Sequence, residues 1–352
     1  MLAVATRSPA DERSLMRDAD DVVTVELKVA DASVGQLRMR GREGTPDGAV
    51  LRLVTTLIAS EVERVRAPAR ASEEAAMSFQ RAVLSRRIED RDDLIARGNE
   101  LGTDLSEGAS VAVVRAHARN PTEDDWRRRL LAMAARGARS IATGAIAAPT
   151  DVDAPEVVVL IPDAEGETGR RVAAAVLREV EAGLPGFSFA LGRSRRVEDP
   201  LDLQRAYNEA LLALNVAEGD SERVALAYEE TGTYQLLLPY MSDPVELKRF
   251  YKETVRPLVA YDEQYETDLL GTLATFLDCD ANVNATAARL ITHRHTIRYR
   301  FERVRELTGL DVSSTDGREK LSLGLKAMRV LGIPAPNGPA TEPGASGGRV
   351  PR

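Results

Sequence analysis

The chain has one cysteine, Cys279, among its 352 residues. An intrachain disulfide is therefore impossible, and a thiolate zinc site is disfavoured because such sites use several cysteines. Long apolar runs are also lacking: the densest, VVVLIP at residues 157–162, is far shorter than the ~20 residues of a membrane span. Charges interrupt residues 1–20, which hold no apolar core, so no signal peptide is visible. We expect a cytoplasmic protein with no membrane partner.

Positive charge is in short supply overall, since 47 Lys and Arg face 55 Asp and Glu for a net charge of -8. This balance argues against wholesale binding to nucleic acid. It leaves room for a local basic surface, because charges are screened beyond about 10 Å at 0.1 M salt. Residues 289–305 carry six arginines against one glutamate, and NVNATAARLITHRHTIRYRF at 282–301 holds two of the three histidines. The positive charge is concentrated on this short stretch.

Aromatic residues are only 4% of the chain and are unevenly spread, with Phe79 alone before Trp126 and a regular supply after Phe187. This shift indicates modules of different origin, in an α+β multidomain protein. Residues 22–66 predict strand, turn, strand and helix, a core so thin that the domain is partial or is completed by a partner. Residues 70–100 predict a charged helical connector, packed or coiled, with these residues on its buried side: Phe79, Val83, Leu84, Ile88, Leu94 and Ile95.

Strand and helix patterns alternate through residues 109–228. The first helix is expected to have Thr122 as its N-cap, and the second is expected to end at Gly183. A βαββαβ order with an extra αβ unit predicts a ferredoxin-like α/β sandwich. Residues 229–262 predict a helical connection and 263–333 an all-α domain. The tail at 334–352, with five prolines and four glycines, is expected to be disordered.

The basic stretch predicts two short helices joined by a tight corner. The first runs from about Asn284 to residue 290 and carries small residues that allow another helix to approach closely. Thr292 is expected to cap the second, which runs from residue 293 to about 307. A wheel of roughly 100° per residue groups Ile297, Phe301 and Val304 into a buried stripe. His295, Arg298, Tyr299 and Arg303 fall away from it.

A small-residue helix, a tight corner and an exposed basic helix are typical of a helix-turn-helix, whose second helix enters the major groove of DNA. Charge alone does not decide this, because a basic amphipathic helix is often only a solvated face. A metal site at His293 and His295 is disfavoured, since residues two apart diverge on a helix and no third ligand is near.

The segment DLLGTLATFLDCDANVNATAARLITHRHTIRYRFERVRELTGLDV at 268–312 resembles the C-terminal helix-turn-helix of the PucR/CdaR family of bacterial transcription regulators. His295 departs from the family pattern, where Asn is usual. Residues 109–228 resemble the family's middle domain, related in fold to GGDEF nucleotide cyclases, and residues 22–66 resemble the last part of a GAF-type sensory domain. The resemblance, together with the helical wheel, gives this DNA-binding set: Asn284, Thr286, Thr292, His293, Arg294, His295, Thr296, Arg298, Tyr299, Arg300 and Arg303.

The resemblance to cyclases does not extend to their chemistry. At the GG[DE]EF hairpin this chain has DAPEV at 153–157, so both glycines are gone and Pro155 removes a backbone donor. Arg115 and His117 stand where a cyclase has a metal-binding aspartate. We therefore expect no enzyme activity, no catalytic residues, no metal and no cofactor.

The resulting hypothesis is a bacterial, sequence-specific DNA-binding regulator that acts as a homodimer or higher oligomer and responds to an unknown small-molecule effector. Two alternatives remain open: a degenerate nucleotide-binding or cyclase-like enzyme, and a module whose terminal helices bind another protein. The expected organisation is a partial GAF-like domain at 1–66, a connector at 67–104, a degenerate GGDEF-like domain at 105–228, a linker at 229–262, the helix-turn-helix domain at 263–333 and the tail at 334–352.

Overall fold

The computed structural model describes residues 22–29, 32–40, 48–119, 125–151, 154–219 and 223–336. These fall into two compact units, residues 1–75 and 76–352. Thr122 and most of the tail expected to be disordered, residues 337–352, lie outside the described ranges. No helix within these ranges is long and apolar enough to cross a membrane.

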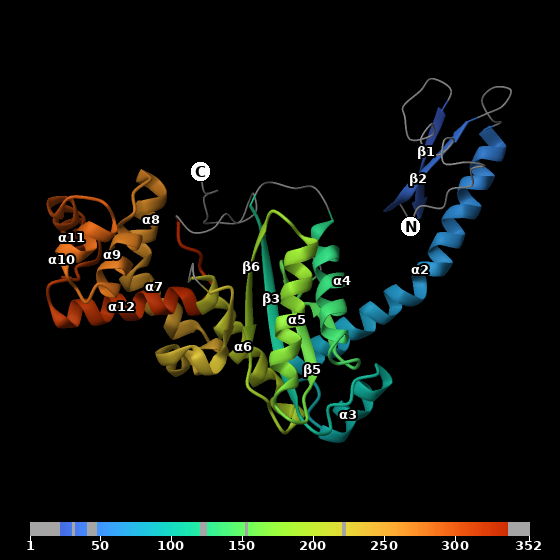
Figure 1. The fold of residues 1–352 in the computed structure, drawn as a ribbon, viewed down its shortest axis with the longest axis horizontal. Coiled ribbons are helices and arrows are strands. Elements are labelled where there is room, and N and C mark those ends of the chain that lie inside the picture. The colour runs from blue at the N-terminus through green and yellow to red at the C-terminus, as the bar shows by residue number, and fades with distance from the viewer. Residues whose placement is uncertain are drawn as a thin grey trace. The chain divides into compact units, whose positions relative to one another are not determined.

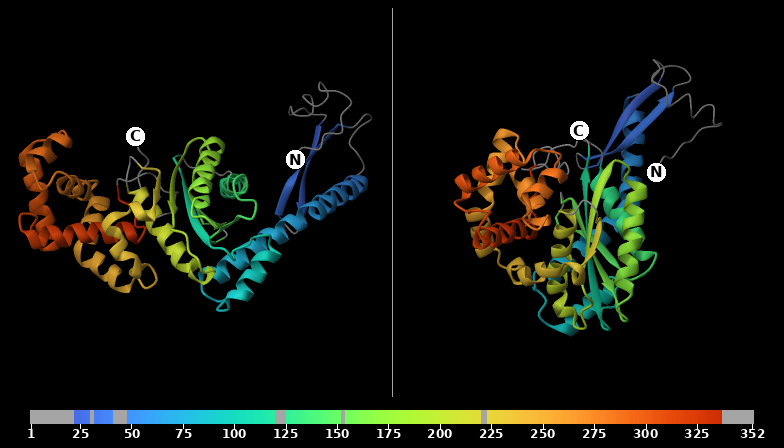
Figure 2. Two further views of the ribbon diagram at one scale, coloured as in Figure 1. Left: turned by 60° about the horizontal axis from the view of Figure 1, so that its bottom comes forward. Right: turned by 60° about the vertical axis from the view of Figure 1, so that its left-hand side comes forward.

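The first unit has the predicted order of strand, turn, strand and helix. Strands β1 (Val22–Val29) and β2 (Ala32–Arg40) form an antiparallel hairpin whose register shifts between Leu27 and Lys28 (Figure 2). Helix α2 (Gly48–Leu84) follows and runs through the boundary expected at residue 66. A hairpin and one helix do not distinguish a GAF-like domain from other folds, and that resemblance stays a prediction.

The middle domain is a mixed sheet of five strands. Its elements are β3 (Ala109–Ala118), α4 (Trp126–Arg139), β4 (Ile146–Pro149), β5 (Glu156–Pro162), α5 (Thr168–Gly183), β6 (Phe187–Arg193), η1 (Pro200–Asp202), α6 (Leu203–Glu218) and β7 (Ala225–Ala227). The sheet order is β4-β5-β3-β6-β7, antiparallel except for β6 with β7. The first four strands have the order of a split βαβ fold, which confirms the ferredoxin-like prediction.

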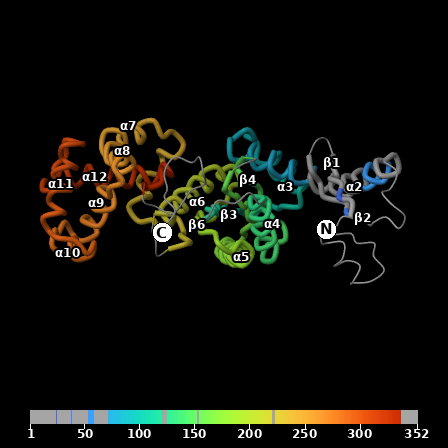
Figure 3. The backbone as a smooth tube through the Cα atoms, turned by 90° about the horizontal axis from the view of Figure 1, so that it is seen from above, coloured from blue at the N-terminus to red at the C-terminus, as the bar shows by residue number. Residues whose placement is uncertain are grey.

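Helices cover both faces of this sheet. Helices α4 and α5 lie on one face and α6 on the other (Figure 1, Figure 3). Strand β3 is buried on both faces, because Ala112 and Val114 pack toward α4 and α5 while Val111 and Val113 pack toward α6. Because helices cover both faces of the sheet, side chains on both sides of β3 are buried. The strand therefore has a continuous apolar run and not an alternation of polar and apolar residues.

The segment expected as a connector packs onto this middle domain. Phe79 and Val83 at the end of α2, together with Leu94 of α3 (Arg91–Glu100), belong to the apolar cluster on the α6 face of the sheet. Helix α4 begins at Trp126 with Asp125 as its N-cap, later than the predicted cap at Thr122. The buried Trp126 ring packs against Phe187 with centroids 5.2 Å apart.

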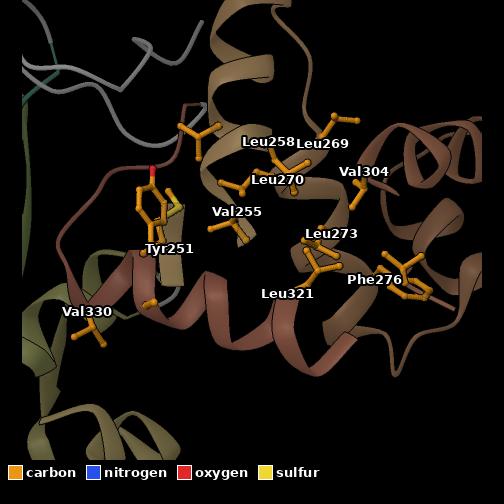
Figure 4. Close-up of a cluster of buried hydrophobic side chains, with 14 of the residues drawn as sticks. Tyr251, Val255, Leu258, Leu269, Leu270, Leu273, Phe276, Val304, Leu321 and Val330 are labelled. Carbon is orange, nitrogen blue, oxygen red and sulfur yellow. The ribbon is translucent and has the colours of Figure 1, made fainter. Parts of the chain in front are cut away.

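The C-terminal part is entirely helical, as predicted. It comprises η2 (Tyr228–Glu230), η3 (Gly232–Met241), α7 (Val245–Thr254), α8 (Arg256–Tyr265), α9 (Leu269–Asp278), α10 (Val283–Arg289), α11 (Arg294–Thr308) and α12 (Thr315–Val330). Helices α7 and α8, expected as a linker, contribute Tyr251, Val255 and Leu258 to the same core as α9 and α12. Figure 4 shows Leu273 of α9 and Leu321 of α12 pointing toward one another in this core.

A buried carboxylate joins α8 to α9. Asp262 of α8 is 3% exposed. Its Oδ1 accepts hydrogen bonds from the Leu269 amide at 2.8 Å and the Thr267 hydroxyl at 2.6 Å, and its Oδ2 accepts one from the Leu270 amide at 2.9 Å. These amides are among the first of α9, which have no partner inside that helix, so the carboxylate both caps α9 and fixes its position against α8.

Candidate nucleic-acid interface

Helix α10 is the first helix of the predicted pair. Asn282 caps it, with its side-chain Oδ1 accepting from the amides of Asn284 at 2.9 Å and Ala285 at 3.1 Å. Thr286 and Ala287 are buried, and the Thr286 hydroxyl donates to the Asn282 carbonyl at 2.8 Å. The small residues of α10 thus serve for close packing, as the sequence predicts.

The tight corner is a Schellman motif at the end of α10. The Thr292 amide donates to the Ala287 carbonyl at 2.9 Å, and the Ile291 amide donates to the Ala288 carbonyl at 3.2 Å. This pattern needs a left-handed residue, usually glycine, and here Ile291 adopts φ 49° with its side chain 95% exposed. A β-branched residue in this conformation is strained.

The Schellman motif also moves the cap of α11 by one residue from the prediction. The Thr292 amide takes part in the Schellman motif that ends α10. The first extended residue after the corner is therefore His293, with φ -90° and ψ 145°. His293 caps α11, and its Nδ1 accepts from the His295 amide at 3.3 Å. Thr292 is half-buried and makes no side-chain cap.

The two histidines do not diverge as expected for helical positions. Because His293 is extended and His295 is helical, their rings stack with centroids 4.9 Å apart and an interplanar angle of 20°. Among the described residues, no group of three or more His, Cys, Asp or Glu side chains is arranged to hold a metal ion.

Helix α11 has one apolar stripe, and that stripe is buried as the helical wheel predicts. Ile297 and Val304 are 0% exposed and Phe301 is 7% exposed. The Phe301 ring packs against Phe276 of α9 with centroids 4.5 Å apart. Burial of this stripe turns the opposite side of the helix toward solvent, and these predicted residues are exposed: Arg294, His295, Thr296, Arg298 and Tyr299.

The exposed face carries unneutralised positive charge. The guanidinium groups of Arg294 and Arg298 on α11, and of Arg289 at the end of α10, are exposed and form no ion pair within the described part of the chain. Arg305, further along α11, lies 3.8 Å from the Asp311 carboxylate. Unpaired arginines beside the first turns of a second helix are suited to phosphate oxygens and guanine edges. Arg289 was not in the predicted set, although its place in the basic run signals it.

Three residues of the predicted set face the protein instead. Thr286 is fully buried. Arg300 is half-buried, and its Nη1 donates to the Thr272 hydroxyl of α9 at 2.6 Å. Arg303 lies over the Tyr261 ring of α8, 5.4 Å from the ring centroid, and its Nη1 is 2.7 Å from the Glu306 carboxylate. The wheel placed Arg303 away from the core, but α8 approaches α11 on that side.

The sheet of the middle domain carries a second cluster of charges, at Arg115 and His117 of β3. Arg115, 8% exposed, forms ion pairs with Glu156 of β5 and Glu218 of α6. The other oxygen of the Glu218 carboxylate meets His117 Nε2. The positions where the resemblance implies a metal-binding acid thus hold an internally paired guanidinium and a histidine. Sequence reasoning found both residues but not their glutamate partners.

The charges in this cluster shift one another's ionisation. Burial acts to raise the pKa of Glu218, but the hydrogen bond from His117 and the charge of Arg115 outweigh it and hold that pKa below its usual value. Burial acts to lower the pKa of Arg115, yet the two carboxylates raise it above its usual value. The pKa of Tyr207 on α6 is raised to about 12, first by burial and then by the charge of Glu156.

Two family models match the chain. Residues 269–327 match the PucR C-terminal helix-turn-helix domain, and residues 85–216 match the GGDEF-like domain. The first match spans α9 to α11 and most of α12, and the second spans α3, strands β3 to β6 and most of α6. The chain therefore carries a PucR C-terminal helix-turn-helix domain and a GGDEF-like domain, and its curated relatives are PucR-type regulators.

Three of these relatives show the extent of the likeness. The proline-responsive transcriptional activator PutR of Bacillus subtilis is 30% identical over 131 residues, 37% of this chain and 32% of that protein. The purine catabolism regulatory protein of Bacillus subtilis is 37% identical over 145 residues, 41% of this chain and 27% of that protein. The carbohydrate diacid regulator of Escherichia coli is 30% identical over 185 residues, 50% of this chain and 46% of that protein. The chain spans less than half the length of each.

The strain at the corner predicts a stabilising substitution. Ile291→Asn should raise the free energy of unfolding by about 1 kcal/mol, because Asn tolerates the left-handed conformation better and the 95% exposed isoleucine side chain gives up no packing. Urea unfolding of the full chain measures the change. Ile291→Val keeps the β-branch and is the matched control, with no gain expected. Equal stability of the Asn and Val variants would contradict the strain.

Removing the guanidinium from the sheet should destabilise the middle domain. Arg115→Met leaves the half-buried carboxylates of Glu156 and Glu218 without the guanidinium that neutralises them, which lowers the free energy of unfolding by about 3–5 kcal/mol at neutral pH. Adding Glu156→Gln and Glu218→Gln to the Arg115→Met chain should restore most of the lost free energy of unfolding, because no unpaired carboxylate is left.

The pH dependence follows from the sign of the Glu218 shift. A lowered pKa contributes stability above the carboxyl's usual pKa and loses that stability as the pH falls through the folded-state value. The gap between wild type and Arg115→Met should therefore narrow as the pH falls below ~4, where carboxylates protonate. Urea unfolding at several pH values measures this gap, and a gap independent of pH would exclude the carboxylates as its cause.

Proposed function

We propose that this protein is a bacterial regulator that binds duplex DNA in a sequence-specific manner, with α11 in the major groove. The observation that carries the proposal is the set of three unpaired arginines, Arg289, Arg294 and Arg298, beside the turn between α10 and α11. In a chain of net charge -8, three such arginines around one turn concentrate positive charge on a small surface, which suits an anionic partner.

The proposed contact set divides by chemistry. Arg294 and Arg298 would read guanine O6 and N7, as arginines near the start of a recognition helix do. The smaller polar groups and Arg289 would position the helix on phosphates, and this set is Asn284, Thr292, His293, His295, Thr296 and Tyr299. Arg300 and Arg303 act as positioning residues that hold α11 against α9 and α8. Thr286, being buried, is left out of the set.

Dimerisation and effector control are further parts of the proposal. A single small helix-turn-helix offers limited contact, and a two-fold assembly doubles it on a palindromic site, so we place the protein on DNA as a homodimer or higher oligomer in the cytoplasm. The helices of the DNA-binding domain contact the middle domain through α12, where the Asn215 side chain donates to the Val330 carbonyl at 3.0 Å. This contact offers a physical route for an effector signal.

The proposed function contains no catalytic step. The degenerate cyclase alternative needs metal-binding acids on β3, whereas that strand holds the Arg115 guanidinium already paired with two glutamates. Incubating the purified chain with GTP and Mg²⁺ should therefore leave the nucleotide unchanged by chromatography. Formation of a cyclic or dinucleotide product, lost in Arg115→Met, would favour the enzyme instead.

The DNA interface is tested with a duplex selected from a randomised pool by the wild-type chain. Arg294→Ala and Arg298→Ala should each weaken binding to this duplex by about 1–3 kcal/mol, the value of one good base contact. Arg289→Ala should reduce the slope of log affinity against log salt concentration by about 1, the contribution of one phosphate contact. Fluorescence anisotropy at several salt concentrations measures both effects.

The matched control is Arg170→Ala, which removes the same charge from α5, where Arg170 pairs with Glu167. It should leave both the affinity and the salt slope unchanged. Binding that ignores salt, or that survives Arg294→Ala and Arg298→Ala together, would contradict the groove assignment and favour a protein partner for these helices.

A further inference from the structure

A cavity of about 880 Å³ separates the middle domain from the DNA-binding helices. Its walls come from β6 and the end of α6 on one side, and from the start of α9 and the end of α12 on the other. Apolar side chains line it on both sides, among them Leu184, Phe187 and Phe189 of the middle domain and Leu270 and Met328 of the helical domain. This size and lining suit a small organic molecule.

The side-chain oxygen of one buried amide in the wall has no hydrogen-bond partner among the described residues. Asn215 of α6 is 6% exposed, and its Nδ2 donates to the Val330 carbonyl at 3.0 Å. Its Oδ1 accepts no hydrogen bond from any described residue. Buried polar atoms in proteins are nearly always satisfied by a protein, water or ligand donor, so this oxygen is the point in the wall at which a bound molecule would place a donor.

The cavity also offers unpaired positive charge. The Arg329 guanidinium of α12 is half-buried and donates to the Tyr234 hydroxyl at 2.9 Å, and Arg119 after β3 is exposed. Neither forms an ion pair with a described carboxylate. Three acidic residues also line the cavity. Glu218 is paired with Arg115 and His117, and the Asp268 carboxylate accepts from the Gly271 amide at 3.1 Å. Glu181 is exposed to solvent, which screens its charge.

We propose that this cavity binds a small amphipathic anion: an apolar, ring-sized body bearing one anionic group for Arg329 and one N–H or O–H donor for Asn215 Oδ1. The bound molecule bridges the two domains. It touches α9 at Leu270, Gly271 and Ala274, and the same helix carries Thr272 and Phe276, which contact Arg300 and Phe301 of α11. Occupancy thereby fixes the helix on which the DNA-facing helix rests, a consequence that depends on the proposed function.

The probe for this site is 8-anilinonaphthalene-1-sulfonate, which combines an aromatic body, a sulfonate and an aniline N–H. Fluorescence titration of the full chain should give one site per chain. Arg329→Met and Asn215→Leu should each weaken binding at least tenfold, and Ala274→Phe, which fills the cavity, should do the same. Circular dichroism and thermal unfolding establish that each variant is folded.

Two control variants test whether a loss of probe binding comes from a lost contact with the probe or from a change elsewhere in α12. Tyr234→Phe removes the hydroxyl partner of Arg329 but keeps the guanidinium, so probe affinity should stay within about twofold of wild type. Lys320→Met removes a cation from the exposed part of α12, where Lys320 pairs with Asp316, and should also leave affinity unchanged. Probe binding that is unaffected by Arg329→Met and Asn215→Leu in folded protein would overturn the proposal.

Because the titration contains no DNA, its outcome is independent of the proposed function. A chain that binds the probe through Arg329 and Asn215 but never retains a duplex supports the cavity site and refutes DNA binding. If both activities are present, saturating probe should change affinity for the selected duplex at least threefold in wild type and not in Arg329→Met. If saturating probe leaves the affinity for the duplex unchanged, the proposed effect of the bound molecule on α11 is wrong.

Discussion

Burial of the single apolar stripe on α11 is the constraint on which the proposed interface depends. Ile297 and Val304 are fully buried and Phe301 stacks on Phe276, so α11 has one rotational setting against α9. That setting turns Arg294 and Arg298 outward without any contact of their own to hold them. The stability of the apolar core therefore positions the charged face, and within the described part of the chain Arg294 and Arg298 form no ion pair. Helix α9 is fixed in turn by the Asp262 carboxylate, which ties its first amides to α8.

The middle domain holds its charge cluster as an internally neutralised set. Arg115 on the central strand supplies a positive charge inside the sheet, and Glu156 and Glu218 neutralise it locally. A buried guanidinium with two carboxylates is stable only as a complete set, because loss of one member leaves an unpaired charge in a poorly solvated place. Helix α6 also presents Asn215 to α12, and the cavity between the domains lies beside this contact.

The sequence-based errors at the interface share one physical origin. Periodicity on a single helix predicted the buried stripe and the exposed arginines of α11 correctly, because each depends on one helix and one core. It placed Arg303 in solvent, and the family resemblance added Arg300 as a DNA contact. Neither Tyr261 of α8 nor Thr272 of α9 can be seen from the sequence of α11 alone. It assigned the cap to Thr292, because a Schellman motif is expected with glycine and Ile291 gives no such signal.

The amino-acid sequence by itself determined the order of elements, the ferredoxin-like middle domain, the all-α C-terminal region and the concentration of arginine around the second helix. These follow from local periodicity and from charge, which act over a few residues. The tertiary structure alone decided that α7 and α8 join the helix-turn-helix core, that Glu156 and Glu218 pair with Arg115, and that Asn215 and Arg329 meet one cavity. In the last two groupings the paired residues are 41 to 114 positions apart, and only the packing of the sheet and helices brings them together.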